Sequence, residues 1–357
     1  MTKEHPLYDN LPINPTYPPH SAWGVWGIHD AIGTLNLIPK DQIIKSFKYI
    51  KYRQEEKSCE HKVFSLTWIP NQRNTHLFSR GHIPQSIRAR IHNFPETDFS
   101  YDDYVQTIKS PTEWHNLRSF SSADDAYCRF YNGISLGEVI SSCRAPKAQE
   151  DLSYTQGPKV GVNSKGASAT SVVAGRAILL DYARWASSYV NTNKDEYNPL
   201  QRTAITAQEL EKVAESQGLT APYFQRGDIL LIRTGWITAY ENAKDISTGF
   251  NIMKPQCAGI ETSENMFRWL WNYGLAALAT DSFSFEAFPP QPMDGGSSCH
   301  SRLIGSWGMT VGELFNLDEM AEASANNNIY EYYFKSEISI NNQQGFPTCS
   351  FYATSSF

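Results

Sequence analysis

Short apolar segments alternate with helical patterns in the second half of the chain, and this alternation limits the fold more than any other feature. Three segments are typical of buried strands: AGRAILLDYARWA at 174–186, which we expect to end in a turn, RGDILLIRTGW at 226–236, and LAALATDSFSFEAFPP at 275–290. Residues 205–218 and 261–274 lie between them and have the apolar spacing of amphipathic helices. Strands that alternate with helices predict an α/β fold.

The helix expected at 205–218 carries its own start and stop signals. Thr206 is the predicted N-cap, and Glu209, three residues later, completes a capping box with it. Gly218 is expected to end the helix, because glycine readily adopts the left-handed conformation found there.

Bulk composition excludes several classes of protein. With 41% hydrophobic and 13% aromatic residues, the 357-residue chain has the composition of a folded globular protein. Its net charge of −6 comes from interspersed acids and bases, so no basic surface suggests nucleic acid or an anionic membrane as a partner. No apolar run could span a membrane, and the N-terminus lacks the apolar core of a secretory signal. The six scattered cysteines are expected to be reduced, so we predict a cytoplasmic protein.

The chain is predicted to form one domain with an arm before it. Residues 1–20 contain five prolines and are expected to form an extended arm, followed by a single α/β domain at 21–357. Residues 69–100 are polar and are interpreted as a loop. Residues 144–172 are rich in small and polar residues without periodicity, which is typical of a lid or a flexible insertion over a site.

The segment GSSCHSRLIGSWGMTVGELFNLDEMA at 296–321 is the first candidate for a functional site. His300 and Glu313 stand at its two ends, and three glycines between them suit a tight strand-turn wall in which backbone approaches backbone or ligand. The two side chains could then converge as metal ligands or as an acid/base pair. The alternative is structural: Glu313 would cap the short helix that follows it, and His300 would be a buried histidine of the core.

A second candidate lies in TEWHNLRSF at 112–120. Glu113 and His115 are two residues apart, so on an extended segment both side chains point to the same face. Two ionisable groups on one face beside aromatic residues can serve proton transfer. The alternative is that Glu113 only forms a surface ion pair with Arg118.

Taken together, the segments resemble the cyclase superfamily of metal-dependent hydrolases, which includes kynurenine formamidase and isatin hydrolase, and especially its long fungal branch. They follow the order of that family from residue 21 to about residue 340. The matching segments are SAWGVWGIHDAIGTLNLI, TEWHNLRSF, FYNG, AGRAILLDYARWA, GDILLIRTGW, RWLWNYGLAALATDSFSFEAFPP and HSRLIGSWGMTVGELFNLDEMA. The resemblance implies a swivelling β/β/α fold, a small-molecule substrate, and a homodimer or homotetramer.

The metal motif of the family is altered in this chain. The family has His-x-x-x-His-x-Asp, with a catalytic histidine four residues after the aspartate. The residues at these positions here are Lys109, Glu113, His115 and Ser119. The resemblance implies that the second metal-binding pair of the family is kept as His300 and Glu313.

Two hypotheses follow from this altered motif. We favour an enzyme of specialised metabolism that needs no cofactor and catalyses cyclisation, elimination or isomerisation of a small aromatic or polyketide-like substrate. Glu113 or His115 would be the base, His300 the acid, and Glu313 the residue that orients it. In the second hypothesis, His115, His300 and Glu313 bind Zn²⁺ or Mn²⁺ in an amidohydrolase or lactone hydrolase, whose metal-bound water replaces the missing histidine. A non-catalytic binding protein is a third, less favoured alternative.

The resemblance also suggests which residues surround the substrate. Asp281 and Glu286 lie on a segment that borders the pocket in the family, and Lys109 and Ser119 occupy former motif positions. The aromatic residues available as pocket walls are Trp114, Phe283, Phe285, Phe288 and Trp307. Arg233 is expected to tie loops together.

Overall fold

A computed structural model describes the greater part of the chain. The described residues are 5–38, 40–50, 61–68, 87–93, 100–106, 112–115, 117, 120–122, 125, 129–138, 172–190, 197–243, 254–291, 298–338 and 349–356. Within these ranges, no helix combines the length and the apolar character needed to cross a membrane.

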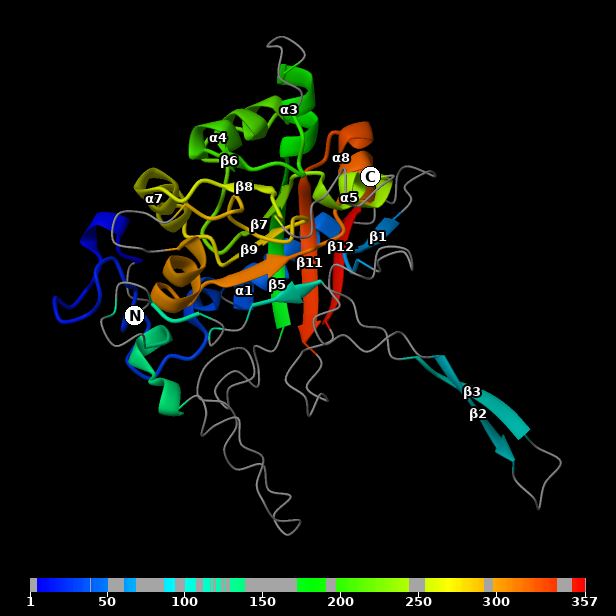
Figure 1. Cartoon of the computed structure of the whole chain (residues 1–357), viewed down its shortest axis with the longest axis horizontal. Coiled ribbons are helices and arrows are strands. Elements are labelled where there is room, and N and C mark those ends of the chain that lie inside the picture. Colours follow the sequence, from blue (N-terminus) through cyan, green and yellow to red (C-terminus); the bar gives the residue numbers. More distant parts are fainter. Residues whose placement is uncertain are drawn as a thin grey trace.

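An eight-stranded mixed sheet forms the centre of the molecule. Its order is β1-β12-β11-β5-β7-β9-β10-β4. Strands β5, β7, β9 and β10 run parallel, whereas β1, β12, β11 and β4 pair with their neighbours antiparallel. The bounds are β1 His61–Ser65, β4 Glu113–Trp114, β5 Val172–Asp181, β7 Ile229–Arg233, β9 Ala277–Thr280, β10 Thr310–Glu313, β11 Glu331–Ile338 and β12 Cys349–Ser356. Figure 1 shows β5, β11 and β12 side by side in this sheet.

The helices and smaller elements surround this sheet and confirm the predicted α/β class. The α-helices are α1 Lys40–Ser46, α3 Tyr182–Val190, α4 Ala207–Ser216, α5 Trp236–Asn242, α7 Glu264–Asn272 and α8 Asp318–Asn327. Short 3₁₀ turns are η1 Tyr8–Asn10, η2 Gly33–Leu37, η3 Phe47–Ile50 and η5 Tyr131–Gly133, and η7 Ser301–Ser306 is a π-helical turn. Strands β6 Thr203–Ile205 and β8 Ala258–Ile260 pair in parallel, and β2 Ile87–Asn93 and β3 Ser100–Gln106 form a hairpin.

Alternation along the central strands divides the core into two layers. In β5, Ile178 and Leu180 face one layer, which also contains apolar residues of α3, α4 and α7. Ala177 and Leu179 face the other layer, where α8 packs. Since β5 is buried on both faces, its sequence is an almost continuous apolar run, as expected of a central parallel strand.

The helix after β6 begins and ends as predicted. The Thr206 side chain accepts a hydrogen bond from the backbone N–H of Glu209, and the Glu209 carboxylate accepts one from the backbone N–H of Thr206. Gly218 has a φ of +75° just after the helix. By contrast, the turn expected at the end of 174–186 is wrong, because Tyr182 begins helix α3 and buries its ring with Ala186 against the core.

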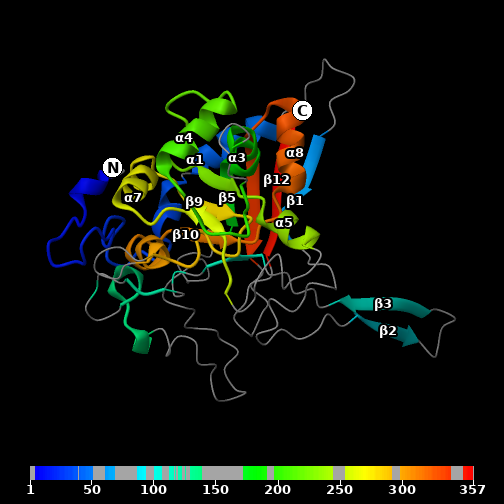
Figure 2. The same ribbon diagram turned by 45° about the horizontal axis from the view of Figure 1, so that its top comes forward.

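The interpretation of residues 69–100 as a loop is wrong for residues 87–93. They form strand β2, which pairs with β3 over its whole length, and both views show this hairpin extending away from the central sheet (Figures 1 and 2). The period-two pattern of Ile87, Ala89 and Ile91 is the signal for this strand. The expected lid at 144–172 lies outside the described residues except for Val172, which begins β5.

The N-terminal arm packs against α7, beside which it lies in Figure 1. The backbone is not extended throughout, since η1 forms a short turn that buries Tyr8. The Tyr8 hydroxyl donates to Glu264 at 2.5 Å, and Nε2 of His5 lies 2.9 Å from the carbonyl oxygen of Trp271.

Candidate functional site

The pairing of β10 with β4 brings His115 beside Glu313. Antiparallel register sets Glu113 opposite Glu313 and Trp114 opposite Gly312, and the backbone N–H of His115 then donates to the carbonyl of Val311 at 2.7 Å. This pairing requires a glycine at position 312, because a Cβ there would lie 2.7 Å from the Trp114 ring.

His300 reaches Glu313 from a π-helical turn. The strand-turn wall expected between the two residues is wrong, because residues 301–306 form η7 and His300 stands directly before it. Such turns occur frequently at functional sites. The chain then reverses at Gly308, whose φ is +66°, and enters β10. Gly305 lets the turn pack directly on the backbone of Ser121, since an added Cβ would lie 2.4 Å from its carbonyl carbon.

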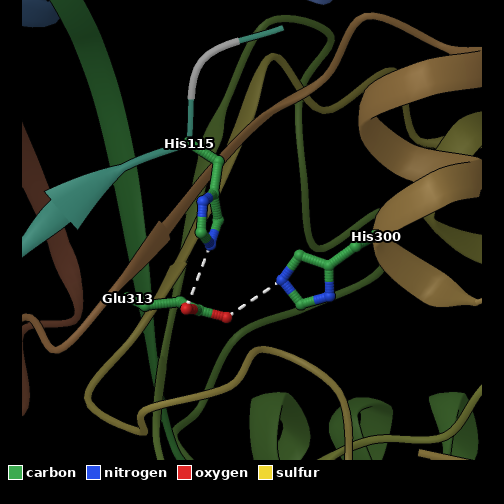
Figure 3. A group of neighbouring side chains, drawn as sticks. All are labelled: His115, His300 and Glu313. Carbon is green, nitrogen blue, oxygen red and sulfur yellow. Dashed lines mark hydrogen bonds and ion pairs between the residues drawn. The ribbon is translucent and has the colours of Figure 1, made fainter. Parts of the chain in front are cut away.

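The carboxylate of Glu313 lies between the two imidazoles, as Figure 3 shows. Nε2 of His115 is 3.0 Å from Oε2, and Nε2 of His300 is 3.0 Å from Oε1. The backbone N–H of Phe285 also donates to Oε1 at 2.7 Å. Glu313 does not cap α8, which has Leu317 at its N-cap, so the structural alternative for this residue fails.

Glu286 holds the other nitrogen of His300. Its Oε1 lies 2.9 Å from His300 Nδ1, while Oε2 accepts hydrogen bonds from the backbone N–H of Cys299 at 2.9 Å and from the Thr262 hydroxyl at 3.0 Å. Glu286 is therefore a buried residue that contacts His300, and the ring of His300 is fixed from both sides.

The attraction between the two imidazoles and the two carboxylates sets the protonation states of His300, Glu313 and Glu286. Burial disfavours a charged imidazole, but the carboxylates of Glu286 and Glu313 outweigh it and raise the pKa of His300 to about 10. Burial likewise disfavours charge on Glu313, yet the imidazoles of His115 and His300 hold the pKa of this carboxyl at about 2. The pKa of Glu286 is also lowered, against burial, chiefly by His300. At neutral pH, His300 is therefore a cation that donates one N–H to each carboxylate.

Phe120 is a member of this group that sequence analysis did not identify. Its ring centroid lies 4.7 Å from that of His300 and 5.5 Å from that of His115. The only signal in the sequence is its place at the end of TEWHNLRSF, five residues after His115. We refer to His115, His300, Glu313, Glu286 and Phe120 as the His–Glu cluster.

Three residues expected near the substrate lie elsewhere. Trp114 packs on Phe315 in the layer beneath α8, and its indole N–H donates to Ser336. Trp307 is wholly buried among the aromatic residues of the N-terminal arm and α7. Asp281 accepts hydrogen bonds from the Thr234 hydroxyl and from two backbone N–H groups, and so holds the turn before α5.

The other residues that the sequence singled out lie in different parts of the structure. Phe283 and Phe288 pack with Trp236 around α5, whereas Phe285 contributes its backbone N–H to Glu313. Lys109, Arg118 and Ser119 lie outside the described residues, as does the side chain of Glu113. Arg233 ties together the ends of two elements through Asp181 and Asp318, as expected.

The chemistry of the donor set fits a divalent cation. One ligand atom from each of His115, His300 and Glu313 can be chosen so that all three lie within 4.8 Å of one another. Two imidazoles and one carboxylate suit Zn²⁺, Mn²⁺ or Fe²⁺. Glu286 on Nδ1 of His300 is the kind of outer partner that commonly orients a metal-binding histidine.

A family model and several solved structures are similar to this chain. A family model described as "Putative cyclase" matches residues 67–287. The crystal structure of a novel cyclase, 21% identical, superposes with a TM-score of 0.65 over 93% of this chain and 99% of that chain. Isatin hydrolase A from Labrenzia aggregata, bound to benzyl benzoate, is 12% identical and has a TM-score of 0.44 over 83% and 94% of the two chains. Isatin hydrolase A from Ralstonia solanacearum, also 12% identical, has a TM-score of 0.43 over 83% and 92%. No curated protein sequence matches this chain.

Proposed function

Since the chain belongs to the cyclase family, we propose that it is an enzyme in which His115 transfers protons during cyclisation, elimination or isomerisation of a small aromatic or polyketide-like substrate. The observation that carries this proposal is the position of the Glu313 carboxylate, which is fixed between two imidazoles of unequal exposure. The side chain of His115 is 16% exposed, whereas those of His300 and Glu313 are 8% and 9% exposed. His115 is thus the ionisable group of the described cluster that a substrate meets first.

Nδ1 of His115 is the ring nitrogen that can take a proton from the substrate. Nε2 is directed at Glu313, so it carries the proton in the neutral ring, and Nδ1 carries the lone pair. No described residue hydrogen-bonds to Nδ1. A C–H or O–H of the substrate next to a carbonyl group can therefore lose its proton to Nδ1.

The Glu313 carboxylate lies where it can stabilise a positive charge that His115 acquires during the reaction. The two carboxylates of Glu286 and Glu313 carry two negative charges, and His300 carries one positive charge, so the neutral ring of His115 leaves the cluster at −1. Uptake of a proton by His115 brings it to zero. Glu313 then stabilises the imidazolium as the carboxylate of a catalytic triad does.

The atom that receives the proton back from His115 determines which of the three reactions takes place. Delivery to a different carbon completes an isomerisation, and delivery to a departing hydroxyl completes an elimination. In a cyclisation, the carbanion or alkoxide formed by deprotonation attacks a second carbonyl carbon of the same molecule, the C=O π bond breaks, and the resulting alkoxide oxygen takes the proton back from His115. In each case His300 and Glu286 act by holding Glu313 and not by touching the substrate.

A variant of His115 tests this proposal. Turnover is surveyed by liquid chromatography and mass spectrometry on three sets of small aromatic compounds: β-hydroxy ketones, open-chain polyketones, and lactones or lactams. Because general acid–base catalysis contributes about 10²- to 10⁴-fold, His115→Gln should slow the reaction by that factor. His29→Gln makes the same change at an exposed histidine and should leave the rate unchanged. Turnover by His115→Gln at the wild-type rate would refute the assignment.

The second candidate function is a metal-dependent hydrolase, which the convergence of three ligand atoms favours. A cation held by His115, His300 and Glu313 would act as a Lewis acid and would lower the pKa of water. For the cation to bind, Nε2 of His115 and Nε2 of His300 must each lose the proton that is directed at Glu313. Binding of the cation therefore releases protons.

Metal analysis separates the two candidates. If the first is correct, extensive chelator treatment leaves both the fold and the rate unchanged. About one Zn or Mn per chain by plasma mass spectrometry, with loss of turnover on its removal, would favour the hydrolase. Proton release on adding Zn²⁺ to weakly buffered, chelator-treated protein gives a readout that needs no substrate.

A further inference from the structure

Three aromatic rings meet over the carboxylate of Glu313. The ring centroids of His115 and His300 are 5.2 Å apart and nearly perpendicular, with an interplanar angle of 82°. Phe120 contacts both rings, edge-on against His115 at 89° and tilted by 36° over His300. Phe120 has no polar atom in its side chain, so it takes no part in the proton transfer described above.

Exposure shows where a substrate can approach. Within the described part of the cluster, His300, Glu313 and Glu286 are buried, and only Phe120 and His115 are partly exposed. The rings of these two residues touch. A molecule that approaches His115 from the side of this contact would therefore lie against Phe120.

The backbone after Phe120 is fixed to the turn that carries His300. Ser122 donates its backbone N–H to the carbonyl of Arg129 at 2.9 Å, and its hydroxyl lies 2.8 Å from that of Ser306. Gly305 leaves no room for even a methyl group between the turn and Ser121. Because His300 and Gly305 belong to the same turn, Phe120 is held in place relative to the cluster.

We propose that Phe120 is the specificity-determining wall of this site, which favours substrates with a flat aromatic ring next to the reacting carbonyl group. This inference rests on the proposed function, because His115 defines where the substrate must lie. Sequence analysis offered Trp114 and Trp307 as aromatic walls, but both point into the core. Phe120 therefore takes their place as the aromatic surface of the site.

The physical basis is the contact between aromatic rings. An aromatic pair in offset or edge-to-face contact gains free energy beyond the area it buries, equivalent to roughly a two- to tenfold change in affinity. A saturated ring of the same size buries a similar area against Phe120 but lacks this contribution. Phe120 should therefore discriminate between two ligands that differ only in aromaticity.

Binding of two matched probes tests the proposal. Benzamide and cyclohexanecarboxamide share a neutral carbonyl group and a six-membered ring, and their affinities are measured by ligand-observed NMR titration of the whole protein. The wild type should bind benzamide roughly two to ten times more tightly. Phe120→Leu and Phe120→Ile should bring this ratio close to one, while Phe120→Tyr should keep it. Circular dichroism checks that each variant is folded, and Phe120→Ile is used if Phe120→Leu does not fold.

His115→Gln distinguishes this inference from the proposed function. It should slow turnover about 10²- to 10⁴-fold but keep the preference for benzamide, because the preference arises in binding alone. Equal affinity of the wild type for the two probes, or no binding of either at its solubility limit, would overturn the role of Phe120. An unchanged ratio in Phe120→Leu or Phe120→Ile would overturn it as well.

Discussion

Gly259 controls how closely strand β8 approaches the segment that carries Glu286, and Gly259→Ala should damage both stability and the cluster. An added Cβ would lie 2.4 Å from the carbonyl carbon of Glu286 and 2.7 Å from the backbone nitrogen of Ala287. Hydrogen bonds between Ile260 and Phe285, and between Ile260 and Ala287, each 3.0 Å long, hold the two segments together. The clash therefore cannot be relieved by a side-chain rotation.

The size of the effect follows from these distances. Carbon atoms in contact lie about 3.5–4.0 Å apart, so the Glu286 backbone must move by about 1 Å. Overpacking of this kind costs about 1–3 kcal/mol of folding free energy. The same movement would stretch the 2.9 Å contact between Glu286 and His300, and a misplacement of about 1 Å can slow a reaction about 10²-fold.

Gly175→Ala is the matched control, because Gly175 also lies buried in a strand. Its added Cβ would meet Ile38 at 3.7 Å, an ordinary contact. Alanine restricts the unfolded chain, so this variant should be as stable as the wild type or more stable by up to about 1 kcal/mol. Urea denaturation followed by tryptophan fluorescence gives both free energies, and product formation gives the rates. If Gly259→Ala matched Gly175→Ala in stability and rate, the proposed link from β8 to the cluster would be wrong.

Two further predictions concern stability away from the cluster. Thr206→Ala removes the capping box of α4 and should lower the free energy of unfolding by about 1 kcal/mol, measured by urea denaturation, with Thr220→Ala at an exposed position as the control. The second concerns Asp281, whose pKa burial raises from 3.8 to about 6. The folded state then binds this proton more tightly than the unfolded state, so the stabilisation is complete below pH 3.8 and is lost as the pH rises through 6. The loss should be about 3 kcal/mol, and Asp281→Asn should remove that much from the change in unfolding free energy between pH 3.5 and 7. An Asp281→Asn variant whose pH dependence equals that of the wild type would contradict this reasoning.

Local patterns in the sequence were sufficient for much of the fold. The capping box at Thr206 and Glu209 depends on residues three apart, and the apolar runs of β7 and β9 are recognisable without their neighbours. The π-helical turn after His300 was missed because its glycines also suit a hairpin. In the structure Gly305 packs against the backbone of Ser121, and local patterns cannot indicate this contact because it joins distant parts of the chain.

Only the part of the candidate site that depends on residues near one another in the sequence could be predicted. His300 and Glu313 are thirteen residues apart, and their convergence was among the expected arrangements. His115 joins them through a strand pairing between residues separated by 198 positions, which spacing alone cannot predict. The tryptophans were assigned to the pocket because aromatic residues suit both a pocket and a core. Adjacent side chains of an extended segment point to opposite faces, so Trp114 points away from His115 and into the core.

Strand β4 lies at the edge of the described sheet and joins it through two residues. The cluster therefore combines parts of very different local stability. Glu313 ends β10, which lies between two strands, and Glu286 and His300 are held by buried hydrogen bonds, whereas His115 stands one residue beyond a short border strand. Local unfolding of such a border needs far less free energy than unfolding of the core. Opening of this edge, which would part His115 from Glu313, is therefore expected to need less free energy than any opening that parts His300 from Glu313.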